Sequence, residues 1–312
     1  MIMTEKKNAD LNTVKIEFHA DDYALFPVQS HRILDCHRNG NLNGVSVMAN
    51  SPCLRECMSD LFPYIKNMTL TVHLNLMEGK SMTDPKQVPL LTDPQGNLNC
   101  SFGNLLLHSF LPKRNVYRQQ LKQELGQQIR AIRDLMEPGT ALRLDGHAHY
   151  HMIPVVFDAM MDVIREEQLP VSYIRIPREY PMLYLRHMGK LKDLSLINLV
   201  KVGILNLLSW RAYRKYGREL ENMEQKLFLG VFLSGRMYYE NVIHLLPDAI
   251  SLAEKLGKDM EILAHPGGVY EENDISQITS ADDREFLTSP MRERERSMFM
   301  IKNGTASAFA EN

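Results

Sequence analysis

The sequence predicts an α/β fold of successive strand–helix units around a parallel sheet, forming a single domain over residues 1–312. Short apolar runs that end in polar or glycine-rich turns alternate with longer segments of helical period, which is the pattern of βα units. No internal repeat or low-complexity linker divides the chain. A length of 312 residues is sufficient for one large α/β domain.

Seven apolar runs are the predicted strands, at residues 14–19, 45–49, 70–74, 142–144, 171–176, 227–233 and 261–265. Between them, residues 115–136 and 154–167 repeat their apolar side chains every three or four positions, which predicts two amphipathic helices. Pro154 suits the first turn of the second helix, because its ring fixes φ and its nitrogen carries no hydrogen.

Two segments depart from this alternation. Residues 83–104 contain three prolines and two glycines, which predicts a long irregular loop over one end of the fold. Residues 194–210 are strongly apolar, but polar residues interrupt them and they fall short of the roughly 20 residues that span a membrane. We expect a buried or lid-forming helical insertion there, near residues 180–217, and an amphipathic surface helix is the alternative.

The composition is that of an ordinary globular protein. Hydrophobic residues at 44% and charged residues at 24% exclude a disordered chain and a coiled-coil rod. A formal net charge of -2 gives no field that would indicate a nucleic-acid partner. The four cysteines are irregularly spaced and the first ten residues hold no apolar signal segment, so we expect a reducing, cytoplasmic location.

Histidines are concentrated where predicted strands end. Six of the eleven lie in or just after the carboxyl ends of these strands: His19, His73, His147, His149, His151 and His265. In α/β barrels the loops at this end form the active site, whereas packing alone would not gather histidines there. Asp21 and Asp22 follow the first strand, and adjacent carboxylates that face one pocket need a cation or a shared proton. By themselves, two adjacent acids are more often solvated residues of a turn.

The segment 145–151, Asp-Gly-His-Ala-His-Tyr-His, carries the strongest signal. In extended backbone, residues two apart point to the same side, so we expect the imidazoles of His147, His149 and His151 to share one face. That face would bind a divalent metal or perform acid–base catalysis. A lone histidine such as His73 or His265 is more often a hydrogen-bonded core residue, and the other histidines are what make these two significant.

The motifs occur in an order that resembles the YdjC family of carbohydrate deacetylases, which includes chitooligosaccharide deacetylase and the hopanoid-biosynthesis deacetylase. They are His-Ala-Asp-Asp-Tyr at 19–23, Val-His-Leu-Asn at 72–75, Asp-Gly-His-Ala-His-Tyr-His-Met at 145–152 and Ala-His-Pro-Gly at 264–267. The resemblance implies a distorted (β/α) TIM-like barrel with a divalent metal at the carboxyl ends of its strands. Two departures are Tyr23-Ala24, where the family often has Phe-Gly, and the longer helical stretch near residues 180–217.

The resemblance also implies roles for individual residues. Asp22, His73 and His147 would hold one divalent ion, with magnesium or zinc preferred, while Asp21 would be the general base and His265 the general acid. A metal held by one carboxylate and two imidazoles keeps positions open for water and for the amide carbonyl.

Four further residues are expected around this centre in supporting or substrate-binding roles: Asp145, His149, His151 and Arg175. Asp145 would orient a ligand imidazole by accepting its second N–H. Arg175 would hydrogen-bond Asp21 or the substrate, and the alternative is a surface arginine in a salt bridge.

The predicted function is metal-dependent removal of the acetyl group from an N-acetylated mono- or oligosaccharide, of chitooligosaccharide type or related. A metal-dependent phosphoesterase or amidohydrolase is one alternative, but those folds carry H-x-H on the first strand, whereas this chain has Asp21-Asp22 there. A barrel that binds sugar without catalysis is the other, although every residue that the mechanism requires is present. No nucleic acid and no membrane span are expected, and a homodimer is compatible with the sequence.

Overall fold

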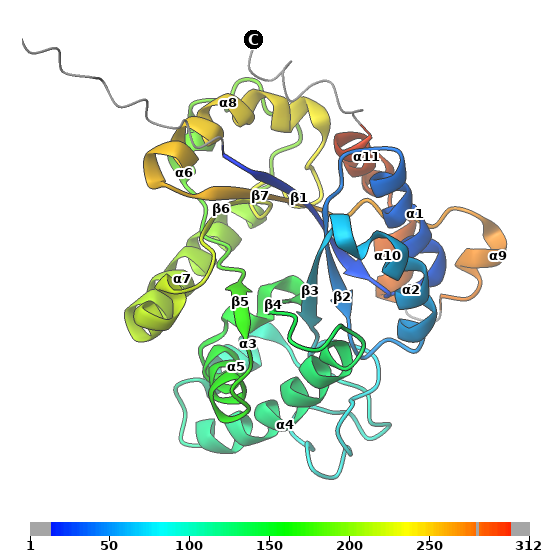
Figure 1. Ribbon diagram of the computed structural model, residues 1–312, viewed down its shortest axis with the longest axis vertical. Coiled ribbons are helices and arrows are strands. Elements are labelled where there is room, and N and C mark those ends of the chain that lie inside the picture. The colour runs from blue at the N-terminus through cyan, green and yellow to red at the C-terminus, as the bar shows by residue number, and fades with distance from the viewer. Residues whose placement is uncertain (1–13, 279–280, 301–312) are drawn as a thin grey trace, which may run out of the picture.

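The computed structural model describes residues 14–278 and 281–300, and these form one curled sheet of parallel strands with helices around it (Figure 1). The strand order is β5-β4-β3-β2-β1-β7-β6. Each of the seven predicted strands is found, as β1 (Ile16–Tyr23), β2 (Gly44–Met48), β3 (Thr69–Leu74), β4 (Leu142–Gly146), β5 (Val171–Ile174), β6 (Lys226–Leu229) and β7 (Asp259–Ala264). The prediction of an α/β fold with parallel strands in a single domain is therefore confirmed.

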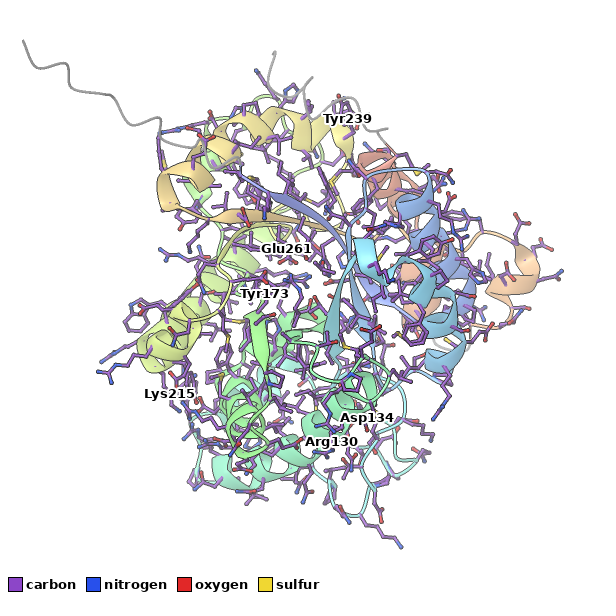
Figure 2. All side chains as sticks on the ribbon, in the orientation of Figure 1. Arg130, Asp134, Tyr173, Lys215, Tyr239 and Glu261 are labelled. Carbon is purple, nitrogen blue, oxygen red and sulfur yellow. The ribbon has the colours of Figure 1, made fainter. Side chains whose placement is uncertain are left out.

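The barrel is only half closed, because β5 and β6 are the ends of the sheet order and do not pair. A flat sheet would hold β5 and β7 five strand spacings apart, roughly 24 Å. Instead the Tyr173 hydroxyl on β5 donates to Glu261 on β7, and Figure 2 shows these two side chains close together near the centre of the molecule. The sheet is thus curled so that one face of its strands encloses an interior.

Helices cover the outside of the sheet. They are α1 (Pro27–Arg38), α2 (Leu54–Leu61), α3 (Phe102–His108), α4 (Arg114–Arg133), α5 (Pro154–Glu166), α6 (Pro181–Leu185), α7 (Leu196–Glu221), α8 (Tyr239–Leu256), α9 (Glu272–Ile275), α10 (Ala281–Thr288) and α11 (Pro290–Phe299), with 3-10 turns η1 (Phe62–Asn67) and η2 (His147–Met152). The two helices expected from periodicity are α4 and α5, and Pro154 occupies the first turn of α5. These two pack together, with Arg118 Nη2 2.5 Å from Asp162 Oδ1.

The long loop after β3 is irregular, as expected, up to the start of α3. Two isolated bridges, Lys80 with Asn97 and Thr92 with Leu98, fold it back on itself. The buried Glu124 carboxylate on α4 fixes one end of the loop by accepting the N–H groups of residues 82 and 83, at 3.1 and 2.9 Å. A charged acceptor shared by two backbone donors holds the loop over the same end of the sheet.

The insertion after β5 comprises α6 and α7, which confirms a helical insertion near residues 180–217, but α7 is buried on one side only. One side of α7 packs on the body of the protein, but the outer face of the helix exposes large apolar side chains such as Leu196 and Leu207. The polar interruptions serve as anchors, since the Asn198 amide donates to the Phe232 and Ser234 carbonyls at 3.1 and 3.0 Å. None of the helices in the described part of the chain combines the length and apolarity that crossing a bilayer requires.

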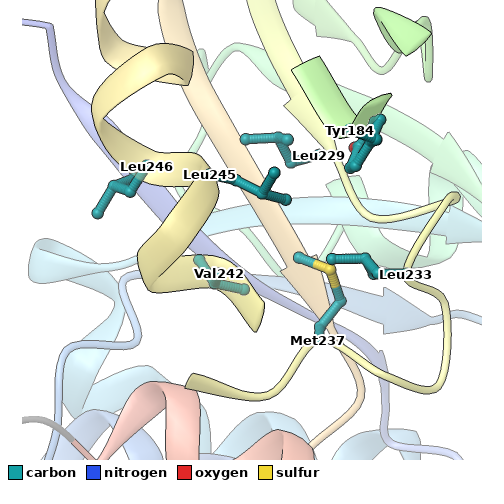
Figure 3. Close-up of a pocket in the computed structure, with 7 residues that line it drawn as sticks. All are labelled: Tyr184, Leu229, Leu233, Met237, Val242, Leu245 and Leu246. Carbon is teal, nitrogen blue, oxygen red and sulfur yellow. The ribbon is translucent and has the colours of Figure 1, made fainter. Parts of the chain in front are cut away.

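An apolar seam joins α8 to β6 and the loop after it (Figure 3). Its lining includes Leu229 from β6 and Leu245 from α8, with Met237 between them. The seam has no room for a water molecule, so it is part of the packed core and not a ligand site.

Charged groups, in contrast, fill the interior of the half-barrel. Arg175, at the end of β5 and fully buried, places Nη1 2.9 Å from both oxygens of Asp21 on β1. The same nitrogen lies 2.6 Å from Asp145 on β4, and Nε donates to Glu261 on β7 at 2.7 Å. One guanidinium therefore joins three other strands of the curled sheet.

Replacing Arg175 with methionine should lower the free energy of unfolding by about 3–5 kcal/mol, because three buried carboxylates would lose their common cation. Urea denaturation followed by circular dichroism measures this. Arg133→Met is the matched control, because Arg133 is 38% exposed and its pairing with Asp134 is a surface contact that contributes about 1 kcal/mol or less. Equal losses in the two variants would show that closure of the half-barrel does not depend on Arg175.

Candidate active site

A bulge in β1 turns two adjacent acids toward the interior. Asp21 follows the alternation of a strand and faces inward like His19. Asp22 would then face outward, but its φ is 66° and the pairing of β1 with β2 shifts register between Ala20 and Tyr23. A non-glycine residue in this conformation costs of order 1–3 kcal/mol and is typical of functional sites. The sequence placed the strand end at His19, and this was wrong, since β1 continues through both acids to Tyr23.

Asp22 meets two imidazoles from neighbouring strand ends. Its Oδ1 lies 3.2 Å from Nε2 of His73 on β3 and 2.8 Å from Nδ1 of His147, which directly follows β4. One ligand atom from each of the three residues lies within 4.8 Å of the other two. Asp22 and His73 are fully buried and His147 is partly exposed, so the cluster is closed on one side and open on the other. The three residues form a candidate metal-binding cluster.

The hydrogen bonds of His73 indicate that a cation fits this cluster. Its Nδ1 lies 2.7 Å from Asp145 Oδ1, and a carboxylate can only accept, so Nδ1 carries the hydrogen. In the neutral ring this leaves a lone pair on Nε2, facing Asp22. Both His73 Nε2 and Asp22 Oδ2 are buried without a hydrogen-bond partner. Two acceptors facing each other require positive charge between them, either a metal ion or a proton.

The surroundings of His73 and Asp22 shift the pKa values of both groups in the direction that this requirement predicts. Burial opposes the charged form of His73, yet the carboxylates of Asp145 and Asp21 raise its pKa to about 10. Burial likewise opposes ionisation of Asp22, but His147 and then His73 hold the pKa of its carboxyl well below the ordinary value. The environment therefore favours a carboxylate with a positive charge beside it.

The distribution of interior charges singles out Asp22. Five carboxylates face the interior, and the permanent cations that pair with them are Arg143, Arg175 and Lys226. Glu17 pairs with Arg143 and Lys226, while Arg175 serves the other three. Of these five carboxylates, only Asp22 has no lysine or arginine partner within the described ranges. The carboxylates exceed the permanent cations by two, which either a divalent ion or protonated histidines would balance.

Two other clusters of possible ligands lie deeper, and cations already occupy their neighbourhood. They are Glu17 with His19 and Glu261, and His19 with Asp21 and Asp145. Arg143 lies 3.0 Å from Glu17, and Arg175 lies 2.9 Å from Asp21. A metal ion there would face these guanidinium groups at close range, so the cluster around Asp22 fits a metal best.

His265 lies beyond the end of β7 and is partly exposed. Its backbone N–H donates to Oε2 of the buried Glu295 on α11 at 2.8 Å, and its Nδ1 is 3.6 Å from the same oxygen. Burial would raise the pKa of Glu295, but Arg292 and His265 keep it below the ordinary value. Glu295 is thus an ionised group that orients His265. No local sequence pattern links Glu295 to His265, because it comes thirty residues later on a separate helix.

Glu78 is a second residue that the sequence analysis missed. It lies in the loop after β3, and its Oε1 is 3.4 Å from Nε2 of His147. Burial and a hydrogen bond with Asp283 raise the pKa of Glu78 to about 8. The signal available in the sequence was its position, five residues after His73 in a loop at the carboxyl end of the sheet.

The expected face of three imidazoles does not exist. The strand β4 ends at Gly146, and η2 contains Ala148 with φ 48° and His149 with φ 60°. These left-handed residues abolish the alternation, so His147 joins Asp22 while His151 Nε2 bonds the Arg175 carbonyl at 2.8 Å. His149 packs edge-on against Phe228, with ring centroids 5.8 Å apart. A run of histidines at every second position cannot reveal a turn of this kind.

Burial and the nearby guanidinium keep these two histidines neutral. Burial, followed by the charge of Arg175, lowers the pKa of His149 well below its ordinary value. Burial also lowers the pKa of His151, to about 4. Neither imidazole lies in the cluster around Asp22, and both line the surroundings of Arg175.

Comparison with known proteins gives distant relatives. The carbohydrate deacetylase of Thermoanaerobacter pseudethanolicus is 26% identical over 163 residues, which are 52% of this chain and 61% of that protein. The chitooligosaccharide deacetylase of Yersinia pestis is 27% identical over 164 residues, 50% of this chain and 58% of the relative. The matches thus span less than two thirds of these relatives.

The fold also matches a solved structure, that of a protein from Enterococcus faecalis described as a putative cellobiose-phosphate cleavage protein. The TM-score is 0.66 at 16% identity, over 96% of this chain and 95% of the other, which is a similarity of fold. A family model described as YdjC-like protein matches residues 15–304, and this range includes every strand and the whole cluster around Asp22. The chain therefore belongs to the YdjC-like protein family.

Proposed function

We propose that the protein is a metal-dependent deacetylase that hydrolyses the amide of an N-acetylated sugar. The observation that carries the proposal is Asp22, the interior carboxylate without a lysine or arginine partner in the described residues, facing the unpaired Nε2 of His73. The distant relatives named carbohydrate deacetylase and chitooligosaccharide deacetylase support the choice of reaction.

Asp22, His73 and His147 would hold the divalent ion. When bound, such an ion lowers the pKa of a water molecule and polarises an amide carbonyl. Imidazole ligands favour zinc and the carboxylate tolerates magnesium, so these two ions are the ones to test first. Asp145 orients His73 through the 2.7 Å hydrogen bond and fixes which nitrogen faces Asp22.

Asp21 is the proposed proton acceptor. Both its oxygens lie 2.9 Å from Arg175 Nη1, and Arg175 is itself held by Asp145 and Glu261. The carboxylate therefore has a fixed direction beside Asp22. It takes a proton from the attacking water, whose oxygen forms the new bond to the acetyl carbon.

His265 is the proposed proton donor. Glu295 lies 3.6 Å from its Nδ1 and orients the ring, which leaves Nε2 to give a proton to the departing sugar nitrogen. The carbon–nitrogen bond breaks as that proton arrives. The products are acetate and a free amine, so every atom of the water and the amide is accounted for.

Purified protein should release acetate from N,N'-diacetylchitobiose or another N-acetylated sugar, and a chelator should abolish this release. Addition of zinc or magnesium should restore it, because the cluster around Asp22 would be refilled. An enzymatic acetate assay over a panel of sugars measures the effect. If no sugar yields acetate from protein with bound metal, while an aryl phosphate yields phosphate, the deacetylase proposal is wrong.

The variant Asp21→Asn should lower kcat by about 10²–10⁴-fold, because the amide cannot accept the proton from water. Its affinity for the metal should stay close to that of the parent, as measured by calorimetric titration, since Asp21 is not one of the three ligands. Asp22→Asn is the matched control and should lose metal binding together with activity. Parent-level turnover by Asp21→Asn would remove Asp21 from the reaction.

A further inference from the structure

The outer face of α7 is a continuous apolar surface. Seven large apolar side chains project from it and together are called here the α7 stripe: Leu196, Ile197, Leu199, Val200, Ile204, Leu207 and Trp210. Their exposed fractions reach 83% at Leu196 and 69% at Ile197. The buried residues of α7 lie on the opposite side of the helix, so nothing in the described chain covers the stripe.

Exposed apolar side chains are concentrated in this part of the molecule. Of the twenty large hydrophobic residues that the described chain exposes, eleven lie between residues 182 and 210. Single exposed hydrophobics are ordinary on protein surfaces, but a contiguous group marks a site that contacts another apolar phase.

The polarity of α7 is also unusual for a surface helix. Asn198 and Asn206 turn toward the body, where their amides donate to backbone carbonyls of other segments, including Glu179 at 2.9 Å. An ordinary surface helix points such residues to solvent and its leucines to the core. In α7 the arrangement is reversed, because large apolar side chains face outward and the two asparagines face the body.

Basic residues are frequent in the segment that contains the stripe. Residues 181–221, which run to the end of α7, contain eight lysines and arginines and three acidic residues, Asp193, Glu219 and Glu221, in a chain whose formal net charge is -2. Asp193 is itself 3.1 Å from Arg294, and Glu219 pairs with Arg165. Arg211 and Lys215 pair with the buried Asp158, and the other six basic residues are exposed: Arg186, Lys190, Lys192, Lys201, Arg214 and Arg218.

We propose that the α7 stripe and the six exposed basic residues named above bind the surface of a membrane that contains anionic lipids. In this arrangement α7 lies in the plane of the interface, with its leucines and isoleucines at the acyl boundary and its lysines and arginines at the lipid phosphates. Trp210, the one tryptophan of the chain, lies 5.2 Å from the Arg214 guanidinium and suits the headgroup level.

A second copy of the chain fits this surface less well. A symmetric contact would bring two strongly basic segments together, and like charges at close range oppose such pairing. An anionic lipid surface has the complementary charge. The charge around the stripe is therefore what selects a membrane over a symmetric dimer as the occupant.

The position of α7 relates this surface to the candidate active site. The helix packs against η2, which carries His147, and Asn206 fixes it to the segment after β5. A membrane on the outer side of α7 would thus lie one helix away from the cluster around Asp22. Binding to the membrane does not depend on the deacetylase proposal, and it is tested without any sugar.

The test is co-sedimentation of the full chain with sucrose-loaded vesicles of phosphatidylcholine containing about 30% phosphatidylglycerol, against phosphatidylcholine alone. The parent should bind the anionic vesicles about tenfold more tightly or better, and added salt should weaken this binding because the charges are exposed. The variant Ile197→Ser/Val200→Ser/Leu207→Ser should lose most of the binding.

Two further variants keep the result interpretable. Leu107→Ser/Phe110→Ser removes exposed apolar side chains outside the stripe, 58% and 73% exposed, and should bind like the parent. Lys201→Glu/Arg214→Glu leaves the apolar side chains in place and should lose the preference for anionic lipid. Circular dichroism checks that each variant is folded.

Failure of the parent to bind either vesicle would overturn the proposal, as would equal binding by the parent and the serine variant. Sedimentation velocity supplies the remaining outcome. A parent that is dimeric and a serine variant that is monomeric would identify the stripe as a contact between copies of this chain, and the membrane proposal would be wrong.

Discussion

The contacts of Arg175 hold the half-barrel together. A single buried guanidinium, directly after β5, pairs with carboxylates from β1, β4 and β7, and it reaches β1 and β7 only because the sheet curls. An unpaired buried carboxylate is unstable by several kcal/mol, so the charges and the curvature depend on each other. The interior is consequently polar, unlike the packed aliphatic interior of an ordinary closed barrel.

The same arrangement separates two adjacent acids into different environments. Asp21 faces a permanent cation, while Asp22, rotated by the bulge in β1, faces two imidazoles. Neighbouring carboxylates whose surroundings differ in this way are suited to different tasks, one as proton carrier and the other as metal ligand. The left-handed backbone at Asp22 is thus the local strain on which the division of roles depends.

Much of this could be predicted from sequence because buried parallel strands are apolar runs and their carboxyl ends converge. Asp22, His73 and His147 each follow or end such a run, and they do meet. Glu78 and Glu295 could not be identified, since each approaches its histidine from a loop or helix that no local pattern links to it. The turn at His149 was equally invisible, because alternation in sequence does not report φ.

The segment 194–210 shows a different limit of sequence patterns. Apolar side chains lie on nearly every side of this helix, and such a helix is normally buried all round. The body of the protein covers only the side of the helix that includes Val202, Leu205 and Leu208. The amides of Asn198 and Asn206 attach that buried side to neighbouring segments. Because protein covers only one of its two apolar sides, the other side of this helix requires contact with a second apolar phase. The basic residues near it favour an anionic membrane as that phase.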